Sequence, residues 1–338
     1  MHARVHAQLT SQWINIMGLD TFILQLIAIV VLVCTGVMWN SFNLIATIRM
    51  QLKTKGIQTM ILIIFSFSFS NVILVLSCFA IVLFVTLDPV FMCTKIEAHH
   101  LILVYMWLSS SCVSFWSIAL LSVLHCVKVV SFSIGCFNAL KKNISRITNI
   151  ALLLICLGSF LLFIPFFTLY IPKVTATNTT IGINGTNVTT NTSNTTTKTC
   201  PLPSLSPQIS TPLYTLLYMS FLCPIPLMIM MTTSLRMVIH LCQHVLSLSK
   251  NQTQVQSLDS YLFICKLNIS LVGVYLITLA IVSIFFILKM LELTVSYLLI
   301  IFGFSLYCIM TAALLTASTK KLREKFWRMI CCKETKKQ

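Results

Sequence analysis

Seven apolar runs, each long enough to cross a bilayer, constrain this chain of 338 residues more than any other feature. A membrane-spanning helix needs about 20 consecutive apolar residues, whereas a barrel strand needs only about 10 and alternates in polarity. The runs are continuous and too long for strands, so they predict an all-α fold, a bundle of seven transmembrane helices. The predicted spans are Phe22–Ile48, Thr59–Leu87, Leu101–Val127, Ile147–Ile171, Pro212–Leu241, Tyr261–Leu288 and Val295–Ala317.

The composition agrees with a membrane protein and excludes an ordinary soluble enzyme. Hydrophobic residues make up 57% of the chain and charged residues 9%, whereas soluble domains carry about 25% charge. The net charge of +16 lies between the apolar runs, which indicates contact with anionic lipid and not with nucleic acid. The 14 cysteines form no CxxC pair and lie mostly within apolar runs, so they predict neither a metal nor a redox site.

Basic residues determine the predicted orientation. An odd number of spans places the two termini on opposite sides, and 18 Lys and Arg residues fall on the C-terminal side against 5 on the N-terminal side. The positive-inside rule therefore predicts a multi-pass protein of the plasma membrane with an extracellular N-terminus. The predicted parts are a short N-terminal segment (1–21), the transmembrane domain (22–317) and a cytoplasmic tail (318–338).

A cluster of glycosylation sequons supports this orientation independently. The cluster lies in an Asn- and Thr-rich stretch that is unable to bury a core, within the predicted extracellular loop 172–211. Its sequons are at Asn178, Asn184, Asn187, Asn191 and Asn194. Three other sequons, at Asn143, Asn251 and Asn268, fall on the opposite side or within the membrane and are interpreted as chance matches.

Ionisable groups are missing from the middle of the predicted spans. Pumps, proton-coupled carriers and intramembrane hydrolases need such groups at depth, yet every acidic residue lies at a helix end, in a loop or in the tail. The pair His99-His100 does not predict a metal site, because adjacent helical residues point about 100° apart. The sequence therefore predicts no enzyme, no metal and no cofactor, and favours a receptor that converts binding on one side into an interhelical shift on the other.

Several motifs in the spans have a recognisable spacing. The first span carries Gly36-Val-Met-Trp-Asn40-Ser-Phe42, and the third carries Trp107, Trp116 and Leu121-Ser-Val-Leu-His125-Cys-Val-Lys128-Val-Val-Ser-Phe-Ser133. In these motifs the sequence resembles the bitter taste receptor family (taste receptors type 2). Further similarity lies at Leu140-Lys141-Lys142, Pro226, Leu235, His244, Lys266, Tyr275, Tyr307 and Lys320-Lys321-Leu322-Arg323.

The chain also departs from the family pattern, which indicates a divergent member. The family's Arg in the second helix is replaced by Asn71, the Tyr of the third-helix motif by His125, and the Asn after the first Trp by Ser111. Leu262 stands where the family has a His. Cys308 and Thr311-Ala312 occupy the places of the seventh helix's Pro and His-Ser pair.

The resemblance implies a G-protein-coupled chemosensory receptor for bitter small molecules. It places the agonist pocket in the outer half of the bundle, with Trp107 as an aromatic wall and Ser111 one turn deeper on the same face. Such ligands are mostly apolar with a few polar groups, which suits aromatic contacts and hydroxyl partners. The other expected lining residues are Phe221, Tyr275 and Phe302.

The resemblance also implies a G-protein contact at the inner ends of the third, fifth and sixth helices. The expected partner is a heterotrimeric G protein of the Gi class, similar to gustducin. Binding of lipid headgroups would explain the same basic residues without a protein partner. The candidate residues are His125, Lys128, Lys141, Arg236, His240, His244 and Lys266, with Lys142 beside them.

Two pairs of cysteines are candidates for modification. The tail from Lys320 to Cys332 mixes basic and apolar residues, which predicts a helix in the bilayer interface, and palmitoylation of Cys331 and Cys332 would anchor it. Cys93 and Cys200 are the cysteines of the predicted extracellular segments. The sequence allows either a disulfide between these two cysteines or two free thiols.

Three other functions are alternatives to a bitter taste receptor. A type-1 vomeronasal-like pheromone receptor would share the fold. A small-solute channel or carrier would need a polar path through the bundle, and the serines of the second and third helices are the residues that would line it, although serines also serve as helix contacts. A lipid-modifying enzyme is disfavoured by the lack of a buried acid.

Overall fold

The computed structural model describes residues 2–54, 56, 58–87, 97–130, 135–164, 224–248, 255–291 and 298–330, and within these residues it contains helices and no strand. Seven of the described helices are long and apolar enough to cross a membrane, so the predicted all-α bundle is confirmed. The helices are α1 (His2–Leu52), α2 (Thr59–Leu87), α3 (Glu97–Val129), α4 (Gly135–Leu162), α7 (Pro224–Leu248), α8 (Val255–Met290), α9 (Leu298–Ser318) and α10 (Lys320–Ile330).

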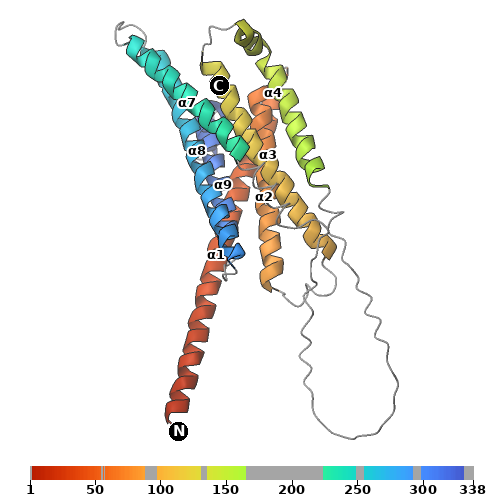
Figure 1. Cartoon of the computed structure of the whole chain (residues 1–338), viewed down its shortest axis with the longest axis vertical. Coiled ribbons are helices and arrows are strands. Elements are labelled where there is room, and N and C mark those ends of the chain that lie inside the picture. The colour runs from red at the N-terminus through yellow and green to blue at the C-terminus, as the bar shows by residue number, and fades with distance from the viewer. Residues whose placement is uncertain are drawn as a thin grey trace, which may run out of the picture.

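The observed spans agree with the predicted ones to within a few residues at most boundaries. The largest difference in the described residues is at the start of α4, whose span begins at Lys142 and not at Ile147. The predicted end of that span, Ile171, lies outside the described residues. Polar residues at the start of α4 are part of the same helix, which apolar run length alone does not detect. Helix α1 also begins earlier than predicted and projects beyond the other helices, as Figure 1 shows.

Helix α3 lies at the centre of the bundle. It packs against α2, α4, α7 and α8, while α9 packs against α1, α2 and α8 (Figure 1). In the most apolar window of α3, 72% of the residues are buried, against 22% in α4. The outward side of α4 instead exposes a row of leucines, which suits contact with lipid. These are Leu153, Leu154, Leu157 and Leu161.

Helix α10 follows α9 and packs back on the first two helices. Its Leu322 is completely buried in a cluster with Ala46 and Met50 of α1 and Ile61 and Ile64 of α2. We call the end of the bundle where α10 packs the α10 end, and the other the opposite end. Helices α1, α3, α7 and α9 finish at the α10 end, because consecutive spans alternate in direction.

A circuit of side-chain hydrogen bonds joins four helices inside the bundle. The Tyr307 hydroxyl of α9 lies 2.9 Å from Ser114 Oγ of α3, which donates to Asn71 Oδ1 of α2 at 2.6 Å. Asn71 Nδ2 donates to Asn40 Oδ1 of α1 at 3.3 Å, and Asn40 Nδ2 donates to the Cys308 carbonyl of α9 at 3.2 Å. This hydrogen-bond network therefore begins and ends at residues of α9, Tyr307 and Cys308. Because polar groups in an apolar interior need partners, it fixes how these helices pack.

Replacing Asn71 with leucine is expected to destabilise the bundle by about 1–3 kcal/mol, because it removes the donor to Asn40 Oδ1 and one of the two partners of the Ser114 hydroxyl. The measurement is the thermal unfolding midpoint of the purified protein in detergent. Tyr307→Phe is the matched control. It removes one terminal bond, and single interhelical bonds in membranes are worth about 0.6 kcal/mol on average. Equal effects of the two substitutions would contradict the central role of Asn71.

A glycine lets α8 and α9 approach closely. Gly303 of α9 is buried, and a Cβ atom built there would lie 2.8 Å from Ile281 Cγ2 and 3.5 Å from Ile281 Cβ of α8. Ordinary contacts between carbon atoms are about 3.5–4.0 Å. The helix pair therefore requires the absence of a side chain at this position, as is common in membrane helix interfaces.

Candidate functional site

The first candidate site is centred on Trp107 in the half of the bundle away from α10. Trp107 of α3 is half-buried, and its ring meets Phe304 of α9 edge to face, with ring centroids 5.7 Å apart. Edge-to-face pairs at this distance are favourable because the positive edge of one ring meets the negative face of the other. The contact places Trp107 between α3 and α9, where it faces the interior of the bundle.

In the helices that the structure describes, the Trp107 indole leaves its N–H unpaired at this contact, and two serine hydroxyls of the same helices are also unpaired. Among the described residues, the buried Trp107 Nε1, Ser109 Oγ and Ser305 Oγ have no hydrogen-bond partner. Ser109 follows Trp107 by two residues and therefore points to the other side of α3, whereas Ser305 follows Phe304 directly. Ser111 is completely buried, and its hydroxyl donates to the Leu108 carbonyl at 2.8 Å. An unpaired buried donor costs free energy, so the Trp107 indole N–H favours the binding of a molecule with a hydrogen-bond acceptor.

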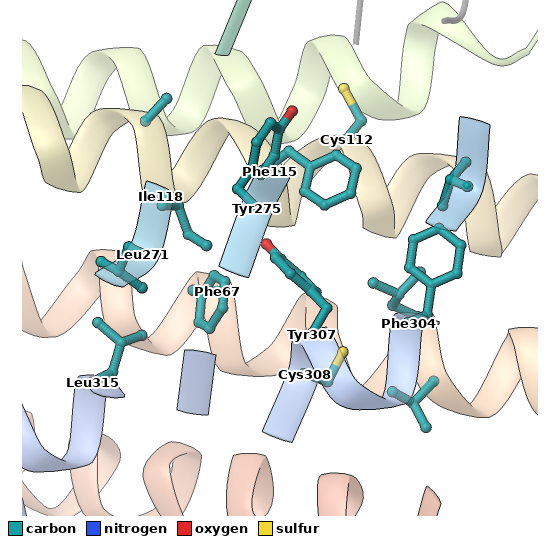
Figure 2. Packing of buried hydrophobic residues seen from close by; sticks show 14 of the residues in the cluster. Phe67, Cys112, Phe115, Ile118, Leu271, Tyr275, Phe304, Tyr307, Cys308 and Leu315 are labelled. Atoms are coloured by element: carbon teal, nitrogen blue, oxygen red, sulfur yellow. The ribbon is translucent and has the colours of Figure 1, made fainter. Parts of the chain in front are cut away.

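An aromatic cluster fills the core between α2, α3, α8 and α9. Phe115 of α3 meets Tyr275 of α8 at 5.0 Å and Tyr307 of α9 at 5.2 Å, in both cases edge to face. Phe67 of α2 meets Tyr307 from another side at 6.4 Å. Figure 2 shows these rings converging from four helices. Tyr275 and Tyr307 are completely buried, so this cluster packs α8 against α3 and α9 in the core of the bundle.

Phe302 is placed differently from the other predicted pocket residues. It is 42% exposed, whereas Phe304, two residues further, is 3% exposed and contacts Trp107. Residues two apart on a helix point about 200° apart, so Phe302 and Phe304 lie on opposite sides of α9. The structure brings Trp107 together with Phe304, and leaves Phe302 on the outward side.

The second candidate site is a polar junction toward the α10 end. Asn268 of α8 is completely buried, and its Nδ2 donates to Ser122 Oγ of α3 at 2.8 Å and to Ser234 Oγ of α7 at 2.7 Å. Ser122 Oγ also lies 2.6 Å from Thr233 Oγ1 of α7. One amide thus joins three helices. Its burial agrees with the interpretation of its sequon as a chance match.

An apolar cluster packs the same three helices together on the α10 side of the Asn268 junction. It consists of Cys126 of α3, Val130 directly after α3, Met237 of α7 and Cys265 of α8, and we call it the inner cluster. Three predicted contact residues, Lys128, Arg236 and Lys266, are exposed and lie next to its members along the chain. The arrangement surrounds a closed apolar contact with positive charge.

The remaining predicted contact residues differ in their accessibility. His125 is 6% exposed, and within the described part of the chain its Nδ1 has no hydrogen-bond partner. His240 is half-buried, and Lys142 is exposed. The side chains of Lys141 and His244 lie outside the described residues. His125 therefore faces the interior of the bundle and becomes accessible only if the helices separate.

Several other predictions fall outside the described residues. These are the pocket residue Phe221, the five sequons from Asn178 to Asn194, the cysteines Cys93 and Cys200, and the tail cysteines Cys331 and Cys332. They stay predictions.

The structure adds residues that the sequence predictions missed. Phe304 is the partner of Trp107, and Asn268 joins three helices. A signal for Asn268 was present, because an amide in the middle of an apolar run needs a partner inside the bundle. No comparable signal marked Phe304.

Comparison with known proteins extends over almost the whole chain. Residues 17–334 match the sequence model of the family described as Taste receptor protein (TAS2R). No curated protein matches the chain. The match includes all the helices that form both candidate sites.

Proposed function

Because the chain belongs to the taste receptor (TAS2R) family, we propose that it binds its agonists around Trp107 and responds by opening the inner cluster. It is a multi-pass membrane receptor that detects bitter small molecules and couples to a G protein. A pheromone receptor, a channel and a carrier are not favoured by the family match. Its family is one of receptors and not of enzymes.

The observation that carries the proposed pocket is the Trp107–Phe304 contact with its unpaired polar neighbours. An apolar agonist would stack against these rings, and its polar groups would pair with the indole N–H of Trp107 and the Ser305 hydroxyl. Ser111 lies one turn deeper, and the predicted contacts Phe221 and Tyr275 belong to the same proposal. In place of Phe302, the proposal takes Phe304, which faces the bundle.

The orientation and the partner are part of the same proposal. The α10 end would face the cytoplasm and the N-terminus the outside of the plasma membrane, which agrees with the excess of basic residues on the α10 side. Opening of the inner cluster would expose His125 between Lys128, Arg236 and Lys266. Such a basic cleft suits a G protein of the Gi class, similar to gustducin, and the resemblance supports that choice.

Replacing Trp107 with alanine is expected to weaken agonist potency by about tenfold or more. Loss of the ring removes the buried area of the contact and an aromatic interaction worth about 0.5–1.5 kcal/mol beyond it, and 1.4 kcal/mol corresponds to a factor of ten. The measurement is calcium release in cells that co-express the receptor with a promiscuous Gα chimera, over a panel of bitter compounds. Trp107→Phe keeps a ring and is expected to retain most of the potency.

Trp116→Ala is the matched control for this experiment. Trp116 lies nine residues along α3, about 180° around the helix from Trp107, and lines a cavity between α3 and α4. Its replacement is expected to leave the dose response unchanged at equal surface expression. An unchanged response for Trp107→Ala would remove that residue from the pocket. A current or substrate uptake without G-protein signalling would contradict the receptor function itself.

A further inference from the structure

A cavity of about 1060 Å³ lies between α1 and α10, away from both candidate sites. It has an apolar part and a basic part. The apolar part includes Trp39 and Phe42 of α1 and Phe326 of α10, and the basic part has four cationic side chains. The full lining is Thr35, Met38, Trp39, Ser41, Phe42, Ile45, Ala46, Arg49, Lys53, Lys325, Phe326 and Arg328.

The apolar part is built by stacked rings. Trp39 lies against Phe326 with ring centroids 5.3 Å apart and planes 14° from parallel, and Phe42 meets the same ring edge to face at 5.4 Å. Trp39 Nε1 donates to Thr316 Oγ1 at 3.0 Å, which fixes the indole. Met38 and Ile45 are 69% and 51% exposed on the outside of α1. The cavity wall is therefore continuous with the surface that faces lipid.

The basic part lies at the depth where the membrane span of α1 ends. The span covers Ile23–Leu52, so Arg49 and Lys53, one helical turn apart on one face, lie at headgroup level. Lys325 and Arg328 line the same part of the cavity from α10. Lys325 Nζ donates to the Ala46 carbonyl of α1 at 3.3 Å. Apolar walls toward the bilayer centre and cations at its surface match the two parts of a lipid.

Among the described residues, no acid lines this cavity to balance its cations. The one acidic residue among the described α10 residues, Glu324, is exposed and does not line the cavity. Burial, together with Lys53, Arg49 and Lys321 nearby, lowers the pKa of the Lys325 ammonium. Mutual repulsion of this kind is relieved when an anion binds between the groups.

We propose that the α1–α10 cavity binds an anionic lipid whose headgroup carries several phosphates, a polyphosphoinositide. Four converging cations suit a headgroup with more than one negative charge, and the arginines form bidentate bonds with phosphate. The apolar part takes the upper acyl chain, which a free phosphate compound lacks. By bridging α1 and α10, the lipid holds α10 against the bundle.

The experiment measures binding of a fluorescent phosphatidylinositol bisphosphate to the purified full-length receptor in nanodiscs of phosphatidylcholine. Arg49→Gln/Lys325→Gln removes two cavity cations. Each cation near a membrane surface is worth about a factor of five, so we expect about 25-fold weaker binding. The control, Lys320→Gln/Arg323→Gln, removes two exposed cations of α10 that do not line the cavity, and its affinity is expected to stay unchanged.

Three outcomes would overturn the proposal. Equal losses in the two double variants would mean that only diffuse charge attracts the lipid. Equal binding of phosphatidylserine at the same total charge, measured on the unmodified receptor, would remove the preference for phosphate groups. If soluble inositol trisphosphate displaced the lipid and bound with the same affinity as the lipid, the cavity would be a site for free phosphate compounds. The assay needs neither agonist nor G protein, so it is independent of the Trp107 proposal.

Discussion

Replacement of Gly303 with alanine lowers the thermal unfolding midpoint and the surface expression of the receptor: this is the expected result with the largest effect on folding. The new methyl group would lie 2.8 Å from Ile281 Cγ2. Ile281 is β-branched, so its Cγ2 is not the end of a long flexible chain, and α8 and α9 must move apart. Overpacking of this kind costs about 1–3 kcal/mol, which changes cellular abundance several-fold.

Gly273→Ala provides the matched control, because a Cβ at that position of α8 has no neighbour within 4 Å. We expect it to be neutral or slightly stabilising, since alanine favours helix. Ile281→Ala in the Gly303→Ala background is expected to restore part of the stability, so that the two changes are not additive. If the two glycine variants behaved alike, the close approach of α8 and α9 would be wrong.

Replacement of Asn268 with leucine is expected to raise basal signalling by about tenfold at equal surface expression. The change removes two interhelical bonds, from α8 to Ser122 of α3 and to Ser234 of α7. Such bonds are worth about 0.6 kcal/mol each on average, and at most about 1.7. Their loss therefore changes the balance of closed and open states by about 1–2 kcal/mol, where 1.4 kcal/mol is a factor of ten. The measurement is agonist-free calcium release with the Gα chimera.

Ser270→Ala is a suitable control for Asn268→Leu. Ser270 lies two residues further on α8, and its hydroxyl donates to the Lys266 carbonyl of the same helix. Its removal loses a polar group but no bond between helices, so basal signalling is expected to stay low. Unchanged basal signalling in Asn268→Leu would mean that the amide holds the three helices in the open state as well.

The sequence predicts the helices well because membrane spans depend on local composition. Run length and apolarity place all seven, and the mixed basic and apolar pattern after Lys320 marks the position of α10. Errors arise where a helix continues through polar residues. In α4 the span begins at Lys142, before the apolar run starts, because its exposed start at the bundle end tolerates charge.

Side-chain direction is harder to predict in a membrane protein. A helix in water reveals its buried face by polar residues on the other side, but α9 is apolar on all sides because lipid replaces water. Phe302 and Phe304 are therefore equivalent in the sequence, although only Phe304 meets Trp107. Asn268 poses a related problem, since its partners are 146 and 34 residues away in sequence.

The hydrogen bonds that α1 donates to the backbone of α9 place few constraints on the side chains of α9. Asn40 and Asn43 of α1 donate to the backbone carbonyls of Cys308 and Ala312 at 3.2 and 3.1 Å. A main-chain carbonyl is present whatever residue supplies it, so the identity of the side chains at 308 and 312 does not enter these bonds. The side chains at these two positions of α9 are thus free to vary, while the asparagines of α1 keep the helix in register.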